Sequence, residues 1–320
     1  MECKIAEAIS PRHYNDGFHS TGTCGSFGSA AACAKLRHLD TKQTAHALGI
    51  VAAEAGGLRD NFGSMTKPFQ AGHAAENGTL AADLAAIGWT AAEDILEGPL
   101  GFFQAAGGGF DPGSIVDRLG KPWTLASPGV SIKPFPCGSL THPAMGEFLE
   151  LVRKNDIKPD QVDKIDIGGN HSMTTTLYHH RPMTGLEAKF SMEFGISILL
   201  LDRKAGLGEF TDEVVQRPDV QAMIPRVNFY VDPDAEKAGF DKMTSLIRIH
   251  LKDGRTISGN AQFAKGSPAN PMSYEDVADK FRGCTDFAKW PAKKADEVIE
   301  AVKTLEHISD MSDLRDSLTA

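Results

Sequence analysis

Apolar residues recur at helical spacing through the first third of the chain. Between Thr21 and Gly108 the sequence is rich in Ala and Gly, and turn signals such as Gly56-Gly57 separate the periodic segments. The pattern predicts helices near residues 22–37, 41–55 and 68–87. Small Ala side chains lie on several sides of the last segment, so we expect it to be buried in a bundle of closely packed helices.

The pattern changes in the middle of the chain. Residues 107–138 are rich in Gly and Pro, which is typical of a loop-rich crossing, and we place a domain boundary near Leu125. Beyond it the sequence predicts a helix at 143–154, a short strand over Val162 to Ile167, and a helix at 185–202. Residues 245–251 alternate imperfectly, Asp253-Gly254 forms a turn and a second strand resumes at Thr256, so a strand pair follows.

The last part of the chain returns to helical periodicity. After a break at 266–273, residues 274–281 and 293–305 read as amphipathic helices. The expected fold class is α plus α/β, in which a mostly helical domain is interrupted by a smaller α/β domain. We assign residues 1–125 to the first part of the helical domain, 126–268 to the α/β domain, and 269–320 to a helical return to the first domain.

Composition narrows the class of protein. A net charge of −9 over 320 residues argues against a general nucleic-acid binder, which needs a surplus of Lys and Arg. The five cysteines are an odd number without a CxxC pair, which fits a reducing cytoplasm better than a disulfide framework. Because no apolar run is long enough for a signal peptide or a membrane span, we expect a soluble cytoplasmic protein that does not bind membranes.

The first candidate for chemistry is His19 in the run Gly17-Phe18-His19-Ser20-Thr21-Gly22. Either Ser20 or Thr21 can cap the helix that follows, so His19 would stand beside a helix N-terminus. Such a position favours anions, and a substrate carboxylate there would lie beside a histidine able to act as acid or base. The alternative is a structural histidine in a loop.

Two lysines that precede proline form the next candidates. Pro68 suits the first turn of a helix, so Lys67 would project from a helix start, while Lys133 lies in the Gly/Pro-rich crossing. Two lysines at element edges facing a cleft can bind two carboxylates, and a desolvated lysine can serve as acid or base. The alternative for each Lys-Pro pair is solvated surface.

A polar cluster in the α/β part gives the remaining candidates. Adjacent His179 and His180 diverge and no third ligand follows at a recognised spacing, so Tyr178 to Arg181 favours an anion-binding or acid/base patch over a metal site. His142 stands at a predicted helix start, where a structural role is expected. Gly22, Gly25 and Gly28 do not match a nucleotide loop and are better explained by close helix packing.

Five stretches in order resemble the MmgE/PrpD family, which includes 2-methylcitrate dehydratase, cis-aconitate decarboxylase and iminodisuccinate epimerase. They are GFHSTGTCGSFGSAAACAKLRHLD, MTKPFQAGHAAENGTLAADLAAIGWT with ILEGPLGFF after it, SIKPFPCGSLTH, EAKFSMEFGISILLLD and KGSPANPMSYEDVADKF. The resemblance implies an all-α domain, an α/β lid and an active site in the cleft between them. It implies catalytic roles for His19, Lys67, Lys133 and Tyr178; we add Ser20, Thr21, His142 and Arg181 as substrate-binding candidates.

The resemblance also sets the expected activity. It implies a lyase, either a dehydratase or a decarboxylase, that acts on a small di- or tricarboxylate such as 2-methylcitrate or cis-aconitate, needs no metal or cofactor, and forms a homodimer. An epimerase or isomerase of the same family is one alternative. Another is a catalytically impaired chain that binds a carboxylate or a partner, because family members usually carry a helical stretch before the GFH motif that we expect this chain to lack.

Overall fold

A computed structural model describes residues 1–239 and 242–318. By internal contacts the chain divides into two units, Met1–Gly129 and Val130–Ala320, and the boundary predicted near Leu125 lies close to this division. Residues 269–320 group with the second unit, and their predicted return to the first unit stays a prediction.

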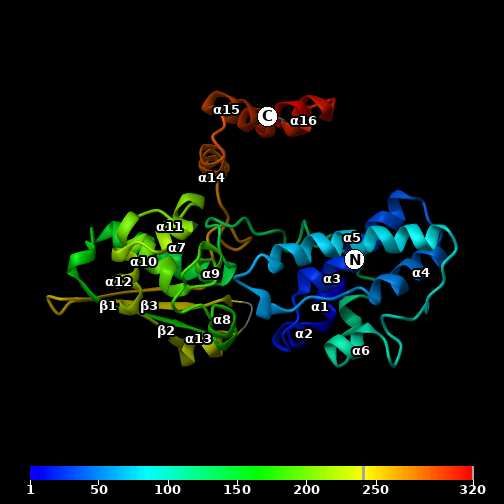
Figure 1. Ribbon diagram of the computed structural model, residues 1–320, viewed down its shortest axis with the longest axis horizontal. Helices are drawn as coiled ribbons and strands as arrows, with labels where there is room; N and C mark the ends of the chain where they lie inside the picture. Colours follow the sequence, from blue (N-terminus) through cyan, green and yellow to red (C-terminus); the bar gives the residue numbers. More distant parts are fainter. Residues whose placement is uncertain (240–241, 319–320) are drawn as a thin grey trace. The chain divides into compact units, whose positions relative to one another are not determined.

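The first unit is helical, as the sequence predicted. Its long helices α3, α4 and α5 pack against one another (Figure 1). The shorter α1 packs against α3. The helix bounds are α1 Glu2–Ile9, α2 Arg12–Asn15, α3 Ser20–Leu36, α4 Thr41–Ala52, α5 Thr66–Ala86 and α6 Phe102–Gly107. The periodicity therefore predicted α3, α4 and α5 to within a few residues, whereas α1 was not predicted.

Small residues bring the elements of this unit together. A Cβ built on Gly78 of α5 would lie 2.4 Å from the backbone nitrogen of Ala30 in α3. A Cβ on Gly22 would lie 2.5 Å from the carbonyl oxygen of Gly56. Gly22 was predicted to allow close packing between helices, whereas its close neighbours are Gly56 and Gly57 of a loop. Phe27 of α3 fills the core beside Phe102 of α6 at a ring separation of 4.7 Å.

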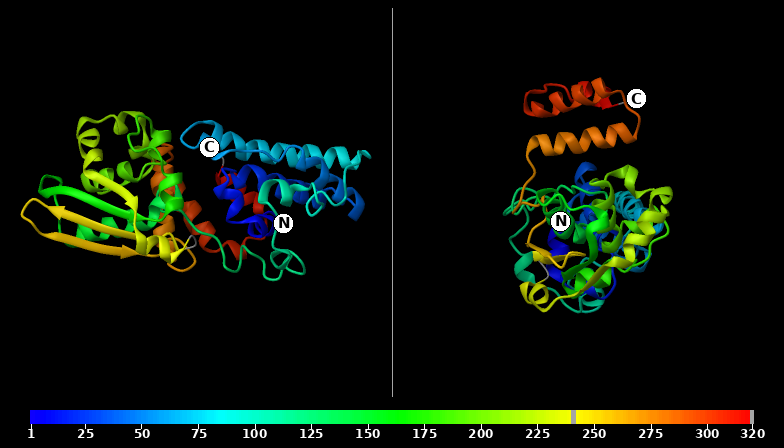
Figure 2. Two further views of the ribbon diagram at one scale, coloured as in Figure 1. Left: turned by 90° about the horizontal axis from the view of Figure 1, so that it is seen from below. Right: turned by 90° about the vertical axis from the view of Figure 1, so that its left-hand side faces the viewer.

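The second unit contains a mixed four-stranded sheet in the order β2-β1-β3-β4. Strand β1 pairs with β2 in parallel and with β3 antiparallel, and β3 pairs with β4 antiparallel. Figure 2 shows these strands side by side, with β1 in green and β3 in yellow. The bounds are β1 Val162–Gly169, β2 Val227–Val231, β3 Ser245–Leu251 and β4 Thr256–Ala261.

Helices cover the apolar face of the sheet. Helix α7 packs on β3 and β4, and α10 packs on β2, above the sheet in Figure 1. Ile165 and Ile167 of β1 are fully buried in this core with Phe148 of α7 and Phe194 of α10. The bounds of the helices up to the second strand are α7 His142–Lys154, α8 His171–Thr176, α9 Gly185–Ala188, α10 Met192–Asp202, α11 Asp212–Val215 and α12 Pro218–Met223.

The remaining helices are α13 Pro233–Ala238, α14 Tyr274–Phe287, α15 Ala292–Lys303 and α16 Met311–Leu318. Helix α14 packs against α15, as Figure 2 shows in its right-hand view. The N-terminus of α14 has a reciprocal cap, because Ser273 Oγ accepts from the Asp276 amide while the Asp276 carboxylate accepts from the Ser273 amide. The α plus α/β fold class is confirmed.

One local prediction for this unit was wrong, and one strand was not predicted. The helix predicted over 185–202 is two helices, α9 and α10, because Ser191 is extended and its hydroxyl accepts a hydrogen bond from the Phe194 amide, which starts a new helix. Strand β2 was not predicted, although its residues Val227 to Val231 pair with the whole C-terminal half of β1.

Candidate active site

His19 stands at the entrance to helix α3. It is itself the N-cap residue, with an extended backbone, and its carbonyl accepts hydrogen bonds from the amides of Gly22 and Thr23. The predicted cap at Ser20 or Thr21 is therefore wrong, because Ser20 is already the first helical residue. The histidine nevertheless lies beside a helix N-terminus, where unsatisfied N–H groups and the helix dipole favour an anion.

The imidazole of His19 is buried and held by a second helix. Its side chain is 6% exposed, and Nδ1 lies 2.5 Å from Oε1 of Gln70 on α5. The Gln70 amide nitrogen donates to the Leu58 carbonyl at 3.2 Å. The ring also meets Phe62 edge to face, with centroids 5.1 Å apart. Two helices and one loop therefore fix this ring.

Lys67 lies in the first turn of α5, where the sequence placed it. Its ammonium nitrogen lies 5.2 Å from the centre of the Phe62 ring, the same ring that contacts His19. Lys67 and Gln70 are three residues apart and so share one side of the helix. The structure thus brings two of the predicted residues, His19 and Lys67, to one place in the first unit, together with Gln70.

The electrostatics of this cluster favour a neutral imidazole. Burial lowers the pKa of His19 below its usual value, the hydrogen bond to Gln70 raises it in part, and the positive charge of Lys67 lowers it further. A neutral imidazole beside an ammonium group can accept a proton while the cation attracts a substrate carboxylate. This pairing is suited to removing a proton next to a carboxylate.

A second buried histidine of the first unit has a structural role. His13 Nδ1 lies 2.8 Å from the Ala106 carbonyl, and Nε2 lies 2.7 Å from the Thr23 hydroxyl. Because a carbonyl can only accept, Nδ1 carries the proton and Nε2 accepts from Thr23. The ring also stacks on Phe18 at 4.6 Å. His13 therefore ties α2 to α3 and α6 with both of its nitrogens engaged.

In the second unit, Lys133 is held by its own loop. Its ammonium donates to the Cys137 carbonyl at 2.9 Å. The residue as a whole is exposed, but the ammonium lies among protein atoms, so desolvation lowers the pKa of Lys133, and the charges of Lys280 and Lys189 lower it further. Lys133 therefore belongs to a locally cationic region in which Lys280 comes from helix α14.

A cavity of about 720 Å³ opens beside this lysine within the second unit. Its lining combines basic and acidic side chains with the apolar ends of Phe135 and Phe287. The basic lining residues are Lys133, Arg153, Arg203, Lys204 and Lys280. The acidic lining residues are Asp276, Asp279 and Asp286, so the cavity carries both signs of charge.

His142 begins helix α7, as predicted, and is 2% exposed. Burial, with a smaller contribution from the charge of Lys133, lowers the pKa of His142 to about 3. Within the described part of the chain its Nε2 has no hydrogen-bond partner. The ring meets Phe135 edge to face at 5.8 Å. His142 is therefore a neutral, buried ring under the Lys133 loop.

The predicted cluster from Tyr178 to Arg181 lies in the loop between α8 and α9. The rings of Tyr178 and His179 are 4.4 Å apart, while Arg181 is exposed. His180 Nδ1 lies 2.7 Å from Oε1 of Glu193, a carboxyl whose pKa is raised by burial. Sequence reasoning missed Glu193, which pairs with a histidine 13 positions earlier in the chain.

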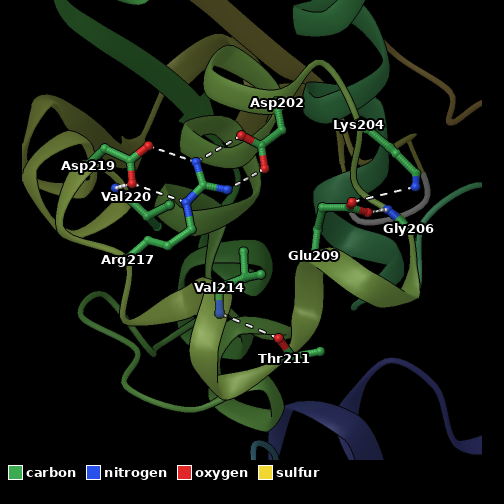
Figure 3. Close-up of polar contacts among 9 residues, drawn as sticks. All are labelled: Asp202, Lys204, Gly206, Glu209, Thr211, Val214, Arg217, Asp219 and Val220. Carbon is green, nitrogen blue, oxygen red and sulfur yellow. Dashed lines mark hydrogen bonds and ion pairs between the residues drawn. The ribbon is translucent and has the colours of Figure 1, made fainter. Parts of the chain in front are cut away.

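Arg217 forms an ion-pair network with two carboxylates of the second unit, shown in Figure 3. Its guanidinium contacts both carboxylate oxygens of Asp202, at 2.6 and 2.9 Å, and both of Asp219, at 3.1 and 2.7 Å. These bonds hold its pKa above the usual value. Both carboxylates neutralise the guanidinium charge, and the bonds to Asp202 join the end of α10 to the start of α12. We therefore assign Arg217 a structural role.

The residue that sequence reasoning missed in the first unit is Gln70. A signal was available, because Gln70 follows Lys67 by three positions in a predicted helix and therefore shares its face. What the spacing could not reveal is the partner, since His19 is 51 positions away in the sequence.

The two predicted residues that follow His19 lie in the first turn of α3, where Ser20 is half-buried and Thr21 is exposed.

No helix within residues 1–239 and 242–318 combines the length and apolarity needed to cross a membrane. The same described residues contain no group of three or more His, Cys, Asp or Glu side chains arranged to hold a metal ion.

Comparison with known proteins gives two family matches. The MmgE/PrpD N-terminal domain matches residues 1–114, and the MmgE/PrpD C-terminal domain matches residues 135–306. Curated relatives include the cis-aconitate decarboxylases of Homo sapiens, 28% identical over 92% of this chain, and of Mus musculus, 29% identical over 92%. That of Aspergillus terreus is 25% identical over 95% of this chain. The chain spans 61% of the length of the human and mouse proteins and 65% of the fungal one.

Proposed function

Since the chain belongs to the MmgE/PrpD family, we propose that it is a lyase acting on a small di- or tricarboxylate, with protein cations rather than a metal stabilising the charge. Cis-aconitate is the first substrate to test, because relatives from three organisms are cis-aconitate decarboxylases. 2-Methylcitrate and citrate follow as candidates for the dehydration branch of the same chemistry.

One observation carries the proposal: His19 is buried at the start of α3, and the ammonium group of Lys67 from α5 lies against the same Phe62 ring that His19 contacts. The helix start and the ammonium both attract a carboxylate, and the imidazole is then placed to exchange a proton with the adjacent carbon. Fixed cations stabilise the negative charge that builds up on that carboxylate in the transition state.

The proton and electron balance is similar for the candidate reactions. In decarboxylation the bond to a carboxylate carbon breaks, carbon dioxide leaves, and the electron pair that remains on carbon takes up a proton. In dehydration a base removes a proton beside a carboxylate and hydroxide leaves from the neighbouring carbon. Both pass through carbanion-like charge next to a carboxylate, which explains why one set of residues serves either reaction.

In the second unit, we assign Lys133 to carboxylate binding and Tyr178 to proton transfer. Ser20, Thr21 and Arg181 are substrate-binding candidates, because the first two lie at the helix start and the third is exposed. His142 is also a candidate, and we expect it to act by supporting the Lys133 loop, because its ring is buried. A homodimeric, cytoplasmic protein stays a prediction.

The test is proton NMR in D2O of the purified chain with cis-aconitate, 2-methylcitrate, citrate and aspartate-derived diacids. We expect new alkene signals, release of carbon dioxide or bicarbonate, or deuterium incorporation with one of these acids. Lys67→Met should lower kcat/KM by about 10²–10³-fold, because it removes a cation aimed at developing charge. Lys42→Met, at an exposed position of α4, is the matched control and should leave turnover unchanged.

Equal turnover in wild type and Lys67→Met would refute the role of Lys67. Saturable binding of these acids without turnover, monitored by calorimetry, would instead favour the alternative of a carboxylate-binding chain. If a diacid exchanges its α-proton for deuterium without other change, the epimerase or isomerase branch is the correct one.

A further inference from the structure

The Gln70 side chain joins His19 to the loop that follows α4. Gln70 is 8% exposed, its Oε1 lies 2.5 Å from His19 Nδ1, and its Nε2 donates to the Leu58 carbonyl at 3.2 Å. We propose that Gln70 is a positioning residue that keeps the His19 proton on Nδ1, so that Nε2 is the basic atom of the site. The inference rests on the acid/base role of His19 proposed above.

The orientation of the amide follows from its surroundings. The Leu58 carbonyl can only accept a hydrogen bond, so the amide NH2 must face it. The amide oxygen then faces His19, and because this oxygen can only accept, the neutral imidazole must donate from Nδ1. The opposite orientation would set the amide oxygen against the Leu58 carbonyl oxygen at 3.2 Å, with no hydrogen between them.

The amide has little freedom to turn away. A Cβ built on Gly57 would lie 3.4 Å from the Gln70 amide carbon, so the loop backbone packs directly on this group. The His19 amide donates to the Gly57 carbonyl at 3.0 Å, which fixes the same loop to the start of α3. The ring of His19 is restrained on another side by Phe62. Ring, amide and loop therefore restrain one another.

A second side-chain amide of α5 also donates a hydrogen bond to this loop, and His19 is not its partner. Asn77, seven residues after Gln70 and 4% exposed, donates to the Glu54 carbonyl at 3.0 Å. Removing Gln70 would therefore leave the loop attached to α5 through Asn77. This makes Asn77 a matched control, because it is also a buried amide that donates to the same loop.

The choice of tautomer decides which nitrogen can act. If the proton moved to Nε2, that atom could no longer accept a proton, and the basic nitrogen would be the buried Nδ1 that faces Gln70. We therefore expect Gln70→Leu to lower kcat/KM by about 10²-fold or more, within the range attributed to a positioned acid/base group. Loss of the hydrogen bond also lowers the His19 pKa, since Gln70 raises it.

The first measurement needs no turnover. Long-range ¹⁵N–¹H correlation NMR at a pH above the histidine pKa distinguishes the two neutral tautomers, and a His19→Asn spectrum assigns the His19 signals. We expect the proton on Nδ1 in wild type and in Asn77→Leu, and a shift of the population toward Nε2–H in Gln70→Leu. His13, whose Nδ1 faces the Ala106 carbonyl, is an internal reference that should stay Nδ1–H in every sample.

The second measurement is the pH dependence of kcat/KM. Gln70→Glu keeps the acceptor and adds a negative charge, so it stabilises the imidazolium and should move the acid limb to higher pH; Gln70→Leu should move it to lower pH. Lys67 is the charged neighbour that acts on His19 in the opposite direction to Glu, and it is unchanged in both variants. A merely structural role of Gln70 would not shift the two limbs in opposite directions.

The outcomes separate the two claims. A wild-type His19 with its proton on Nε2, or a tautomer that is unchanged in Gln70→Leu, would overturn the role of Gln70. If the tautomer responds as expected but the acid limb moves in neither variant, Gln70 does position His19, and it is the acid/base role of His19 in the proposed function that fails.

Discussion

Gly22 offers a sharp test of how tightly the candidate site is packed. A Cβ at this position would lie 2.5 Å from the Gly56 carbonyl oxygen and 3.4 Å from the Gly57 Cα. Because favourable contacts begin near 3.5 Å, Gly22→Ala requires the loop to move by about 1 Å. The loop cannot move freely, since Asn77, Gln70 and the His19 amide all hold it.

The magnitude follows from two opposing effects. Overpacking costs about 1–3 kcal/mol, and the helix propensity of Ala over Gly returns about 0.5–1 kcal/mol, so we expect a net loss of about 1–2 kcal/mol. The matched control is Gly72→Ala in α5, where a Cβ would have no neighbour within 4 Å. This variant should gain about 0.5–1 kcal/mol, so the two Gly→Ala variants should differ by roughly 2 kcal/mol.

Differential scanning calorimetry of both variants measures this difference. For a unit of this size 1 kcal/mol corresponds to roughly 4 °C, so the transition of the first unit should fall in Gly22→Ala and rise in Gly72→Ala, with midpoints roughly 8 °C apart. A Gly22→Ala protein as stable as Gly72→Ala would refute the close approach between the start of α3 and Gly56.

Two further predictions concern the second unit. Arg217→Met should lower the free energy of unfolding of the second unit by about 1 kcal/mol, because Asp202 and Asp219 lose their shared cation. In urea denaturation the difference between wild type and variant should shrink at high salt. A loss of stability that does not depend on salt would contradict an ionic origin. The pKa of His142 is about 3 in the folded state, against an ordinary 6.5. Between these pH values only the unfolded state binds the proton. The free energy of unfolding should therefore fall by up to about 4 kcal/mol as the pH drops from 6.5 toward 3. His142→Leu should flatten this dependence in denaturation curves recorded across that range, and an unchanged slope would count against the buried neutral ring.

Periodicity predicted the long elements because the buried face of each one appears as a regular spacing of apolar residues within the element itself. Helices α3, α4, α5 and α7 and strands β3 and β4 were all placed within a few residues. The division of the predicted 185–202 helix was missed because α9 ends at Ala188 within the apolar pattern, and the extended residue Ser191 then caps a second helix, α10. A continuous apolar pattern does not reveal such a break.

The candidate site could be predicted only as separate residues. Local motifs singled out His19 and Lys67, and the structure brings both to the same place through Phe62 and α5. Gln70 was missed because its role depends on a contact across 51 positions and on the Leu58 carbonyl, neither of which leaves a trace in spacing. Glu193 of α10 was also missed, since its partner His180 lies 13 positions earlier, in the loop between α8 and α9, and no periodicity links the two residues.

The parallel pairing of β1 with β2 imposes an order on how this protein is made. When Val162 to Gly169 leave the ribosome, the neighbour of β1 on that side is still to be synthesised, because residues 170–226 come before β2. Its other neighbour, β3, follows later still. At about 5–20 residues per second, the apolar strand containing Ile165 and Ile167 waits several seconds with both edges open. We therefore expect the yield of folded protein to depend most on events between the synthesis of β1 and that of β2. Chaperone binding, or slower translation through residues 170–226, should have its largest effect in that interval.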